Sequence, residues 1–74
     1  MTAAEALTTD PLPFGTRLLV EDDTSASIEA EGVSVALYQD ETTGEWVAVK
    51  RLLAVCAVAS GRTADEALAG LVGP

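Results

Sequence analysis

The stretch VSVALYQDETTGEWVAV, residues 33–49, carries the clearest structural signal in this chain. Side chains of residues 33–38 alternate between the two sides of an extended backbone, which is the period-two pattern of a β-strand. Residues 40–45 form a polar loop that contains Gly44, and a glycine can adopt the positive φ that tight turns need. The β-compatible run at residues 46–49 follows directly. The stretch therefore predicts a β-hairpin.

A second hairpin is predicted upstream of this one. Residues 17–21 and 27–31 are β-compatible runs, and residues 22–25 between them are turn-forming. The same alternation of apolar and polar side chains is clearest in the second run. We therefore expect a first hairpin that pairs with the central one.

Downstream, the run Leu52–Ala59 is apolar at successive positions. Such a run is typical of a strand buried on both faces, although a short buried helix fits the same periodicity. The β-branched Val55 and Val58 favour the strand. Cys56 lies inside the run, so we expect it to be a buried small hydrophobic residue and not a nucleophile.

The last element is a helix that is specified by its start. Thr63 and Glu66 have the spacing of a capping box, and Asp65 adds a negative charge to the first turn. Gly73 and Pro74 end the pattern. The apolar stripe expected to pack on the sheet is Ala64, Ala67, Leu68, Leu71 and Val72.

These elements predict an α+β fold with an antiparallel sheet of about four to five strands and one C-terminal helix packed on one face. Residues 1–15 are expected to be an extended N-terminal arm, because Thr2 and Glu5 can start at most one turn of helix before the prolines of residues 10–13. Residues 16–74 form the single α+β domain. The core is expected to gather Ala, Val and Leu around the three aromatic residues Phe14, Tyr38 and Trp46.

Charge and size restrict the function. The 74-residue chain carries twelve acidic and four basic residues, a net charge of −8. Such a surface repels phosphate backbones and anionic lipids, so we predict no direct nucleic-acid binding and no membrane association. The N-terminus lacks the pattern of a signal peptide, which favours a cytoplasmic protein. A small core favours self-association into a homodimer or higher homo-oligomer.

Chemistry is also restricted. The chain has no histidine and one cysteine, so it lacks the residues that the usual nucleophilic triads and transition-metal sites require. Its carboxylates gather at residues 21–23 and 40–45, where acidic residues are ordinary turn formers. We predict that the protein is not an enzyme and uses no metal or cofactor.

Two segments of the chain, both within about residues 33–72, form a recognisable pair of motifs. The first is an acidic turn followed by a glycine, an aromatic residue and Val-Ala, and the second is a glycine-x-threonine entering a helix with Glu-Ala-Leu. The residues concerned are Gly44, Trp46, Val47 and Ala48, then Gly61, Thr63, Glu66, Ala67 and Leu68. Together the two segments resemble the HicB-like antitoxin domain, although the match includes neither the family's Pro-Gly-Cys segment nor its DNA-binding region.

The resemblance implies a partial RNase H-like fold without catalytic carboxylates, acting as a protein-binding module that occludes a small basic RNA-cleaving toxin and often dimerises. Two alternatives remain: an acidic viral or mobile-element inhibitor that imitates nucleic acid, and a structural subunit of a larger assembly. The expected partner-binding residues are Asp40, Glu41, Glu45, Trp46, Lys50 and Arg51.

Overall fold

A computed structural model of the chain confirms the central hairpin. Strand β3 spans Val33–Gln39 and strand β4 spans Trp46–Leu52, paired antiparallel. Gly44 has a φ of +76°, in the left-handed region that favours glycine. The loop is closed by the N–H of Asp40, which donates to the carbonyl oxygen of Glu45 at 2.7 Å. The glycine and the polar loop thus have the roles that the sequence predicts.

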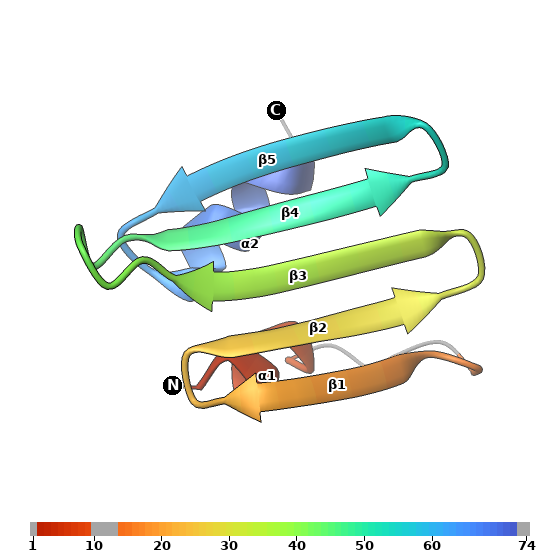
Figure 1. Ribbon diagram of the computed structural model, residues 1–74, viewed down its shortest axis with the longest axis horizontal. Coiled ribbons are helices and arrows are strands. Elements are labelled where there is room, and N and C mark those ends of the chain that lie inside the picture. Colours follow the sequence, from red (N-terminus) through yellow and green to blue (C-terminus); the bar gives the residue numbers. More distant parts are fainter. Residues whose placement is uncertain (1, 10–13, 73–74) are drawn as a thin grey trace.

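The structure describes residues 2–9 and 14–72, in which five strands form one antiparallel sheet in the order β1-β2-β3-β4-β5. The upstream hairpin consists of β1, Arg17–Asp22, and β2, Ser25–Ala30; the outer strand after β4 is β5, Val55–Gly61. Each strand pairs with its neighbours in the chain, so the sheet is a meander with β1 and β5 at its edges (Figure 1).

Helix α2 spans Ala64–Val72 and starts as the capping pattern predicts. The hydroxyl of Thr63 accepts a hydrogen bond from the N–H of Glu66 at 3.2 Å. The carboxylate of Glu66 in turn accepts from the N–H of Arg62 at 2.9 Å, one residue earlier than in the usual reciprocal box. The inner face of the helix is formed by Ala64 and Ala67, which are buried, and Leu68 and Leu71, which are partly buried.

Glycine residues let α2 approach β5 closely. A Cβ atom placed on Gly70 would lie 2.7 Å from the Cβ of Ala59, and one placed on Gly61 would lie 2.5 Å from the Cβ of Glu66. Neither distance can be tolerated without movement of the backbone. A residue without a Cβ atom is therefore needed at both positions for α2 to pack this closely against β5.

The N-terminal segment differs from the expected extended arm. Helix α1 spans Ala3–Leu7, with Thr2 as its N-cap, and Ala3, Ala6 and Leu7 are all buried. The N–H of Ala3 donates to the carbonyl oxygen of Asp23 at 2.8 Å, which fixes the helix to the β1–β2 turn. The capping pattern was thus the correct signal, and this part of residues 1–15 belongs to the domain. Residues 10–13 of the expected arm lie outside the described residues.

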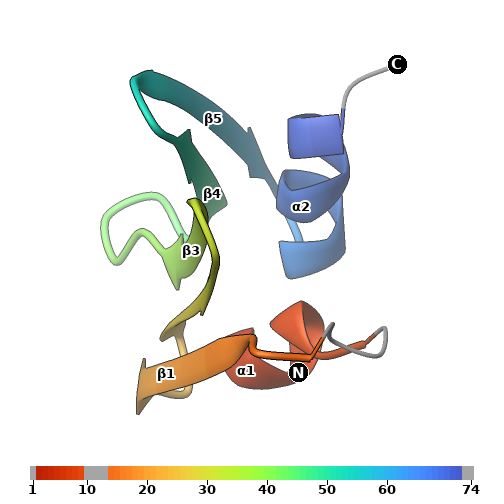
Figure 2. The ribbon, with the colours of Figure 1, turned by 90° about the vertical axis from the view of Figure 1, so that its right-hand side faces the viewer.

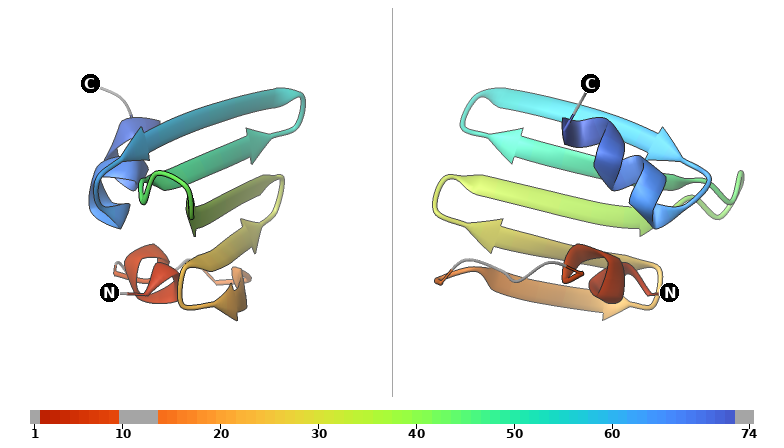
Figure 3. Two further views of the ribbon diagram at one scale, coloured as in Figure 1. Left: turned by 60° about the vertical axis from the view of Figure 1, so that its left-hand side comes forward. Right: turned by 180° about the vertical axis from the view of Figure 1, so that it is seen from behind.

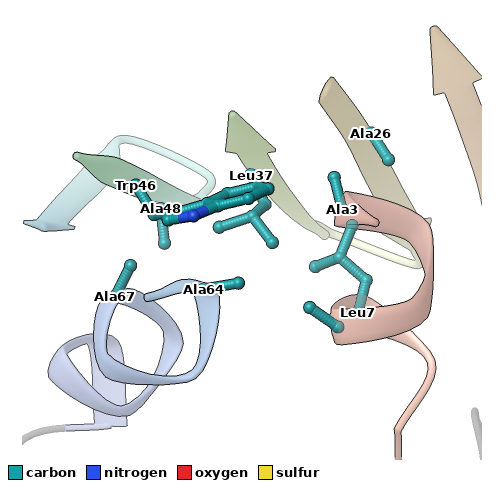
Figure 4. Close-up of a cluster of buried hydrophobic side chains, with 9 residues drawn as sticks. Ala3, Leu7, Ala26, Leu37, Trp46, Ala48, Ala64 and Ala67 are labelled. Carbon is teal, nitrogen blue, oxygen red and sulfur yellow. The ribbon is translucent and has the colours of Figure 1, made fainter. Parts of the chain in front are cut away.

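Both helices pack on the same face of the sheet (Figure 2). Helix α1 lies over β1 and β2, and α2 lies over β4 and β5, as the view from behind shows (Figure 3). Between helices and sheet lies a core of nine buried residues, of which six are alanines (Figure 4). These are Ala3, Ala6, Leu7, Ala26, Leu37, Trp46, Ala48, Ala64 and Ala67. Small side chains keep this layer thin.

Only one of the three aromatic residues expected in the core is there. Trp46 is 9% exposed, whereas Tyr38 is 42% exposed and Phe14 is fully exposed. The reason for Tyr38 is parity, because it lies next to the fully buried Leu37 on β3 and alternate side chains point to opposite faces. The aromatic residues thus do not form one cluster.

The interpretation of Leu52–Ala59 as a strand buried on both faces is wrong. Residues 53–54 form the β4–β5 turn, and β5 is an edge strand whose Val55 and Val58 are each 64% exposed. Cys56, expected to be buried, is exposed. A continuous apolar run fits both a central strand and an uncovered edge strand. The sequence of the run therefore does not show whether a further strand lies beside it.

Candidate protein-binding surface

The meander gathers the turns at two ends of the sheet. The β1–β2 turn, the β3–β4 loop and the connection from β5 into α2 lie at one end, and the β2–β3 and β4–β5 turns lie at the other (Figure 1). The first, the acidic end, carries Glu21, Asp22, Asp23, Asp40, Glu41, Glu45, Asp65, Glu66 and Arg62. The second, the basic end, carries Arg17, Lys50, Arg51, Glu29 and Glu31.

This arrangement makes the molecule electrically bipolar. The acidic end holds eight carboxylates and one guanidinium, a local net of −7, whereas the basic end holds three basic and two acidic groups, a net of +1. Grouped charges of one sign produce a potential that steers oppositely charged macromolecules. The acidic end is therefore suited to a basic partner.

Two carboxylates of the acidic end are occupied by the turns themselves. The Oδ1 of Asp22 accepts from the N–H and the hydroxyl of Thr24 at 2.8 and 3.0 Å. The Oδ1 of Asp40 accepts from the N–H of Thr42 at 2.7 Å and from that of Thr43 at 3.4 Å. Both are Asx turns, in which the carboxylate stabilises the backbone. Their first role is to shape the loops.

Other carboxylates at this end face solvent. Glu41 and Glu45 are exposed, and within the described part of the chain neither carboxylate accepts a hydrogen bond. The loop that carries them is held in place by the side-chain amide of Gln39, which donates to the carbonyl oxygen of Gly44 at 3.0 Å. A braced loop with two unengaged carboxylates can contact a basic surface with little loss of conformational entropy.

The basic end has an apolar tip. In the β4–β5 turn, Leu53 has a φ of +50° and is 97% exposed, and Leu52 and Val55 beside it are also exposed. A left-handed backbone costs a residue with a Cβ about 1–2 kcal/mol. An exposed leucine in this conformation contributes little to folding. Because strained backbone positions are often found at functional sites, the strain at Leu53 suggests that this tip binds another molecule.

The face of the sheet opposite the helices is covered by none of the described elements (Figure 2). Because Trp46 and Ala48 point to the helices, Val47 and Val49 point to this open face. The central row across the open face is formed by Leu19, Ser27, Ala36, Val49 and Val58. Serines interrupt the apolar side chains, so the face is mixed in polarity.

The six residues predicted to bind a partner do not lie together. Asp40, Glu41 and Glu45 are at the acidic end, and Lys50 and Arg51 are at the basic end of β4, where alternation places them on opposite faces. Trp46 belongs to the core, although it also lines a pocket of about 320 Å³ at the start of α2. The prediction thus separates into two surfaces.

Sequence reasoning missed the tip at Leu53 and the exposed edge of β5. The missed signal for the tip was two apolar residues, Leu53 and Ala54, at a position where hairpins prefer glycine or asparagine. No local signal marks β5 as an edge, because its outer side is defined by the end of the sheet.

The carboxylates of the acidic end were also compared with the arrangement that a metal site requires. Within residues 2–9 and 14–72, no group of three or more acidic or cysteine side chains is arranged to hold a metal ion. The pocket lined by Trp46, Arg62 and Thr63 lies at the start of α2, but the N–H groups of Arg62 and Glu66 already donate within the cap. The carboxylate of Glu66 and the hydroxyl of Thr63 accept these two hydrogen bonds, so side chains of the protein itself cap this end of the helix.

Of the helices described, none is long and apolar enough to cross a membrane. Comparison of the chain with protein-family models, with curated proteins and with solved structures finds no match in any of the three.

Proposed function

We propose that this protein is a non-catalytic protein-binding module of the cytoplasm, similar to HicB antitoxins, that occludes a small basic partner protein such as a toxin. The acidic end of the sheet is the docking surface, and the protein acts as a homodimer or higher homo-oligomer. It binds neither nucleic acid nor membrane directly.

The observation that carries this proposal is the grouping of eight carboxylates with a single guanidinium at one end of the sheet. Turn geometry supports it, because Asp22 and Asp40 hold their loops in shape and leave Glu41 and Glu45 free to meet a partner. A preorganised charged surface accelerates association with an oppositely charged protein and gives specificity.

The resemblance to HicB-like domains adds a second argument. Gly44 has the positive φ that its place in the motif requires, Trp46 begins β4, and Thr63 caps the helix that contains Glu66. These are the turn, the strand and the helix start that the matching residues imply. The kinship itself is part of the proposal.

A second candidate function rests on the same surface. Carboxylates spaced along turns can imitate the phosphates of nucleic acid, and an inhibitor of this kind would bind a nucleic-acid-binding protein. Both candidate targets bind nucleic acid, so competition by RNA is expected for an RNA-cleaving toxin as well. Competition by duplex DNA is expected only when the target is a DNA-binding protein, and it therefore distinguishes such an inhibitor from an antitoxin.

The test begins with the reading frames on either side of this one in the native genome. If one of them encodes a small basic protein, its binding to this protein is measured by titration calorimetry, and the absence of any such frame would count against the antitoxin proposal. Glu41→Lys with Glu45→Lys should weaken binding at least about tenfold, which corresponds to about 1.4 kcal/mol. The matched control, Glu29→Lys with Glu31→Lys, makes the same charge change at the other end and should have a much smaller effect.

Equal losses in both double variants would show that only net charge matters, and no binding by the wild-type protein would contradict the antitoxin proposal. Displacement of the protein from its partner by duplex DNA would favour the inhibitor.

A further inference from the structure

The outer strand of the sheet has the composition of an interface. All seven residues of β5, VCAVASG, are uncharged, and none is proline. Its pairing with β4 runs without a register shift from Trp46–Gly61 to Leu52–Val55. Exposed strand edges normally carry a charge, a proline or a bulge, because a flat apolar edge invites pairing with another strand. β5 has none of these.

The other edge of the sheet is protected. β1 carries Arg17, Glu21 and Asp22, and its register against β2 shifts between Val20 and Asp22. A shift of this kind bends the strand, and charged side chains at the edge oppose pairing. The contrast between the two edges indicates that β5 is left open for a specific strand.

We propose that this strand is β5 of a second copy, paired antiparallel about a two-fold axis at Val58, so that the two five-stranded sheets form one continuous sheet. The inference deepens the self-association part of the proposed function and is independent of the identity of the basic partner. Two-fold pairing closes the assembly, whereas pairing of β5 with β1 of another copy would continue indefinitely.

Charge selects the antiparallel orientation. Antiparallel pairing places the basic end of one copy, with Lys50 and Arg51, beside the acidic end of the other, with Asp65 and Glu66 at the start of α2. Parallel pairing would place the two acidic ends side by side. Each copy has a net charge of −8, so the two copies repel each other overall. The paired strands themselves carry no charge, so no like charges face each other between them.

The length of β5 selects the register. A seven-residue strand overlaps fully with its symmetry mate only when the axis lies at its middle residue, Val58. Cys56 then lies opposite Ser60 of the second copy, and Val55 opposite Gly61. The same register carries the exposed Leu53 towards the segment around Arg62 of the second copy, which lines the pocket beside Trp46.

The first test is the mass in solution by analytical ultracentrifugation, at about 50 μM protein, where mass action favours association. The wild-type chain should sediment as twice its 7.6 kDa. Val58→Lys places two ammonium groups at the axis and should raise the dissociation constant at least about tenfold. Leu19→Lys is the matched control, since Leu19 is 42% exposed on the opposite edge and lies in the same row of the open face as Val58, and it should leave the dimer intact.

The second test is disulfide trapping, which is unambiguous because Cys56 is the only cysteine in the chain. With Ser60→Cys, a mild oxidant should link the two copies rapidly, because directly opposite residues have Cβ atoms about 4.5–5.5 Å apart. The wild-type chain should cross-link slowly, because its two Cys56 residues are about 13 Å apart, four residues at about 3.3 Å each.

A monomeric wild-type protein, loss of the dimer in Leu19→Lys but not in Val58→Lys, or equally fast cross-linking of the wild type would each overturn the proposal. Circular dichroism checks that Val58→Lys is folded. The two proposals are tested separately by measuring whether Val58→Lys still binds the basic partner. A monomeric variant that still binds shows that the β5 interface and the docking surface are distinct. The charge variants of the acidic end then test the docking surface independently of dimerisation.

Discussion

At Leu53 the backbone has a φ of +50°, and the side chain is almost entirely exposed. Only the first central residue of this two-residue turn has a positive φ, as in a type II′ turn, where glycine is the preferred residue. The leucine therefore lowers the stability of the free protein. Its presence is explained if the tip contacts a second chain.

Leu53→Gly should raise the free energy of unfolding by about 1 kcal/mol, because relief of the left-handed strain exceeds the extra freedom of glycine in the unfolded state. The melting temperature should rise by about 4–8 °C. Ala54→Gly is the control at the other central position, where φ is not positive, and it should lower the melting temperature. A lower melting temperature for Leu53→Gly would show that the side chain supports the fold.

Among the elements, α2 shows that close packing against β5 constrains which residues the helix can contain. Gly70 is a poor helix former, yet it occupies the place where the helix meets Ala59. An alanine there would improve helix propensity and collide with the sheet. The collision dominates, because the neighbouring Cβ atom belongs to a strand and cannot rotate away.

Gly70→Ala should therefore destabilise the protein by about 1–3 kcal/mol, the usual cost of overpacking, although the same change in an exposed helix stabilises by about 1 kcal/mol. Urea denaturation measures the difference. The double variant with Ala59→Gly removes the colliding atom, so the two changes should compensate each other in part, with a coupling energy of about 0.5–3 kcal/mol. Additive losses, or a stabilised single variant, would contradict this packing.

For the whole molecule, the main feature is the separation of charge. Eight carboxylates share the acidic end with one guanidinium, and six of the nine core residues are alanines that each bury little surface. A small core must therefore offset repulsion between like charges. The surface that suits the protein to a basic partner is also the one that limits its stability when it is alone.

The melting temperature should consequently rise as sodium chloride increases from about 10 mM to about 1 M, because the screening length falls from about 30 Å to about 3 Å. The Val58→Lys background keeps self-association from contributing. Glu41→Gln with Glu45→Gln should melt higher at low salt and gain less from added salt. A melting temperature independent of salt in both proteins would mean that the acidic end costs no stability.

Elements whose signals are local could be predicted from the amino-acid sequence alone. The central hairpin follows from alternation and from Gly44, and α2 follows from the hydrogen bonds that Thr63 and Glu66 can make within one turn of chain. The short helix α1 was also encoded locally, at Thr2 and Glu5, but its docking was not. These features need no knowledge of distant residues.

Which residues share a surface could not be predicted in this way, because it depends on how the strands are arranged in space. The meander placed Glu41 and Lys50 at opposite ends although they are nine positions apart, and it brought turns from distant parts of the chain into one acidic end. It also left β5 at an edge, so that Val58 and Cys56 are exposed. Burial and charge grouping depend on what lies next to a strand in space, and an apolar strand has the same sequence with or without a neighbour.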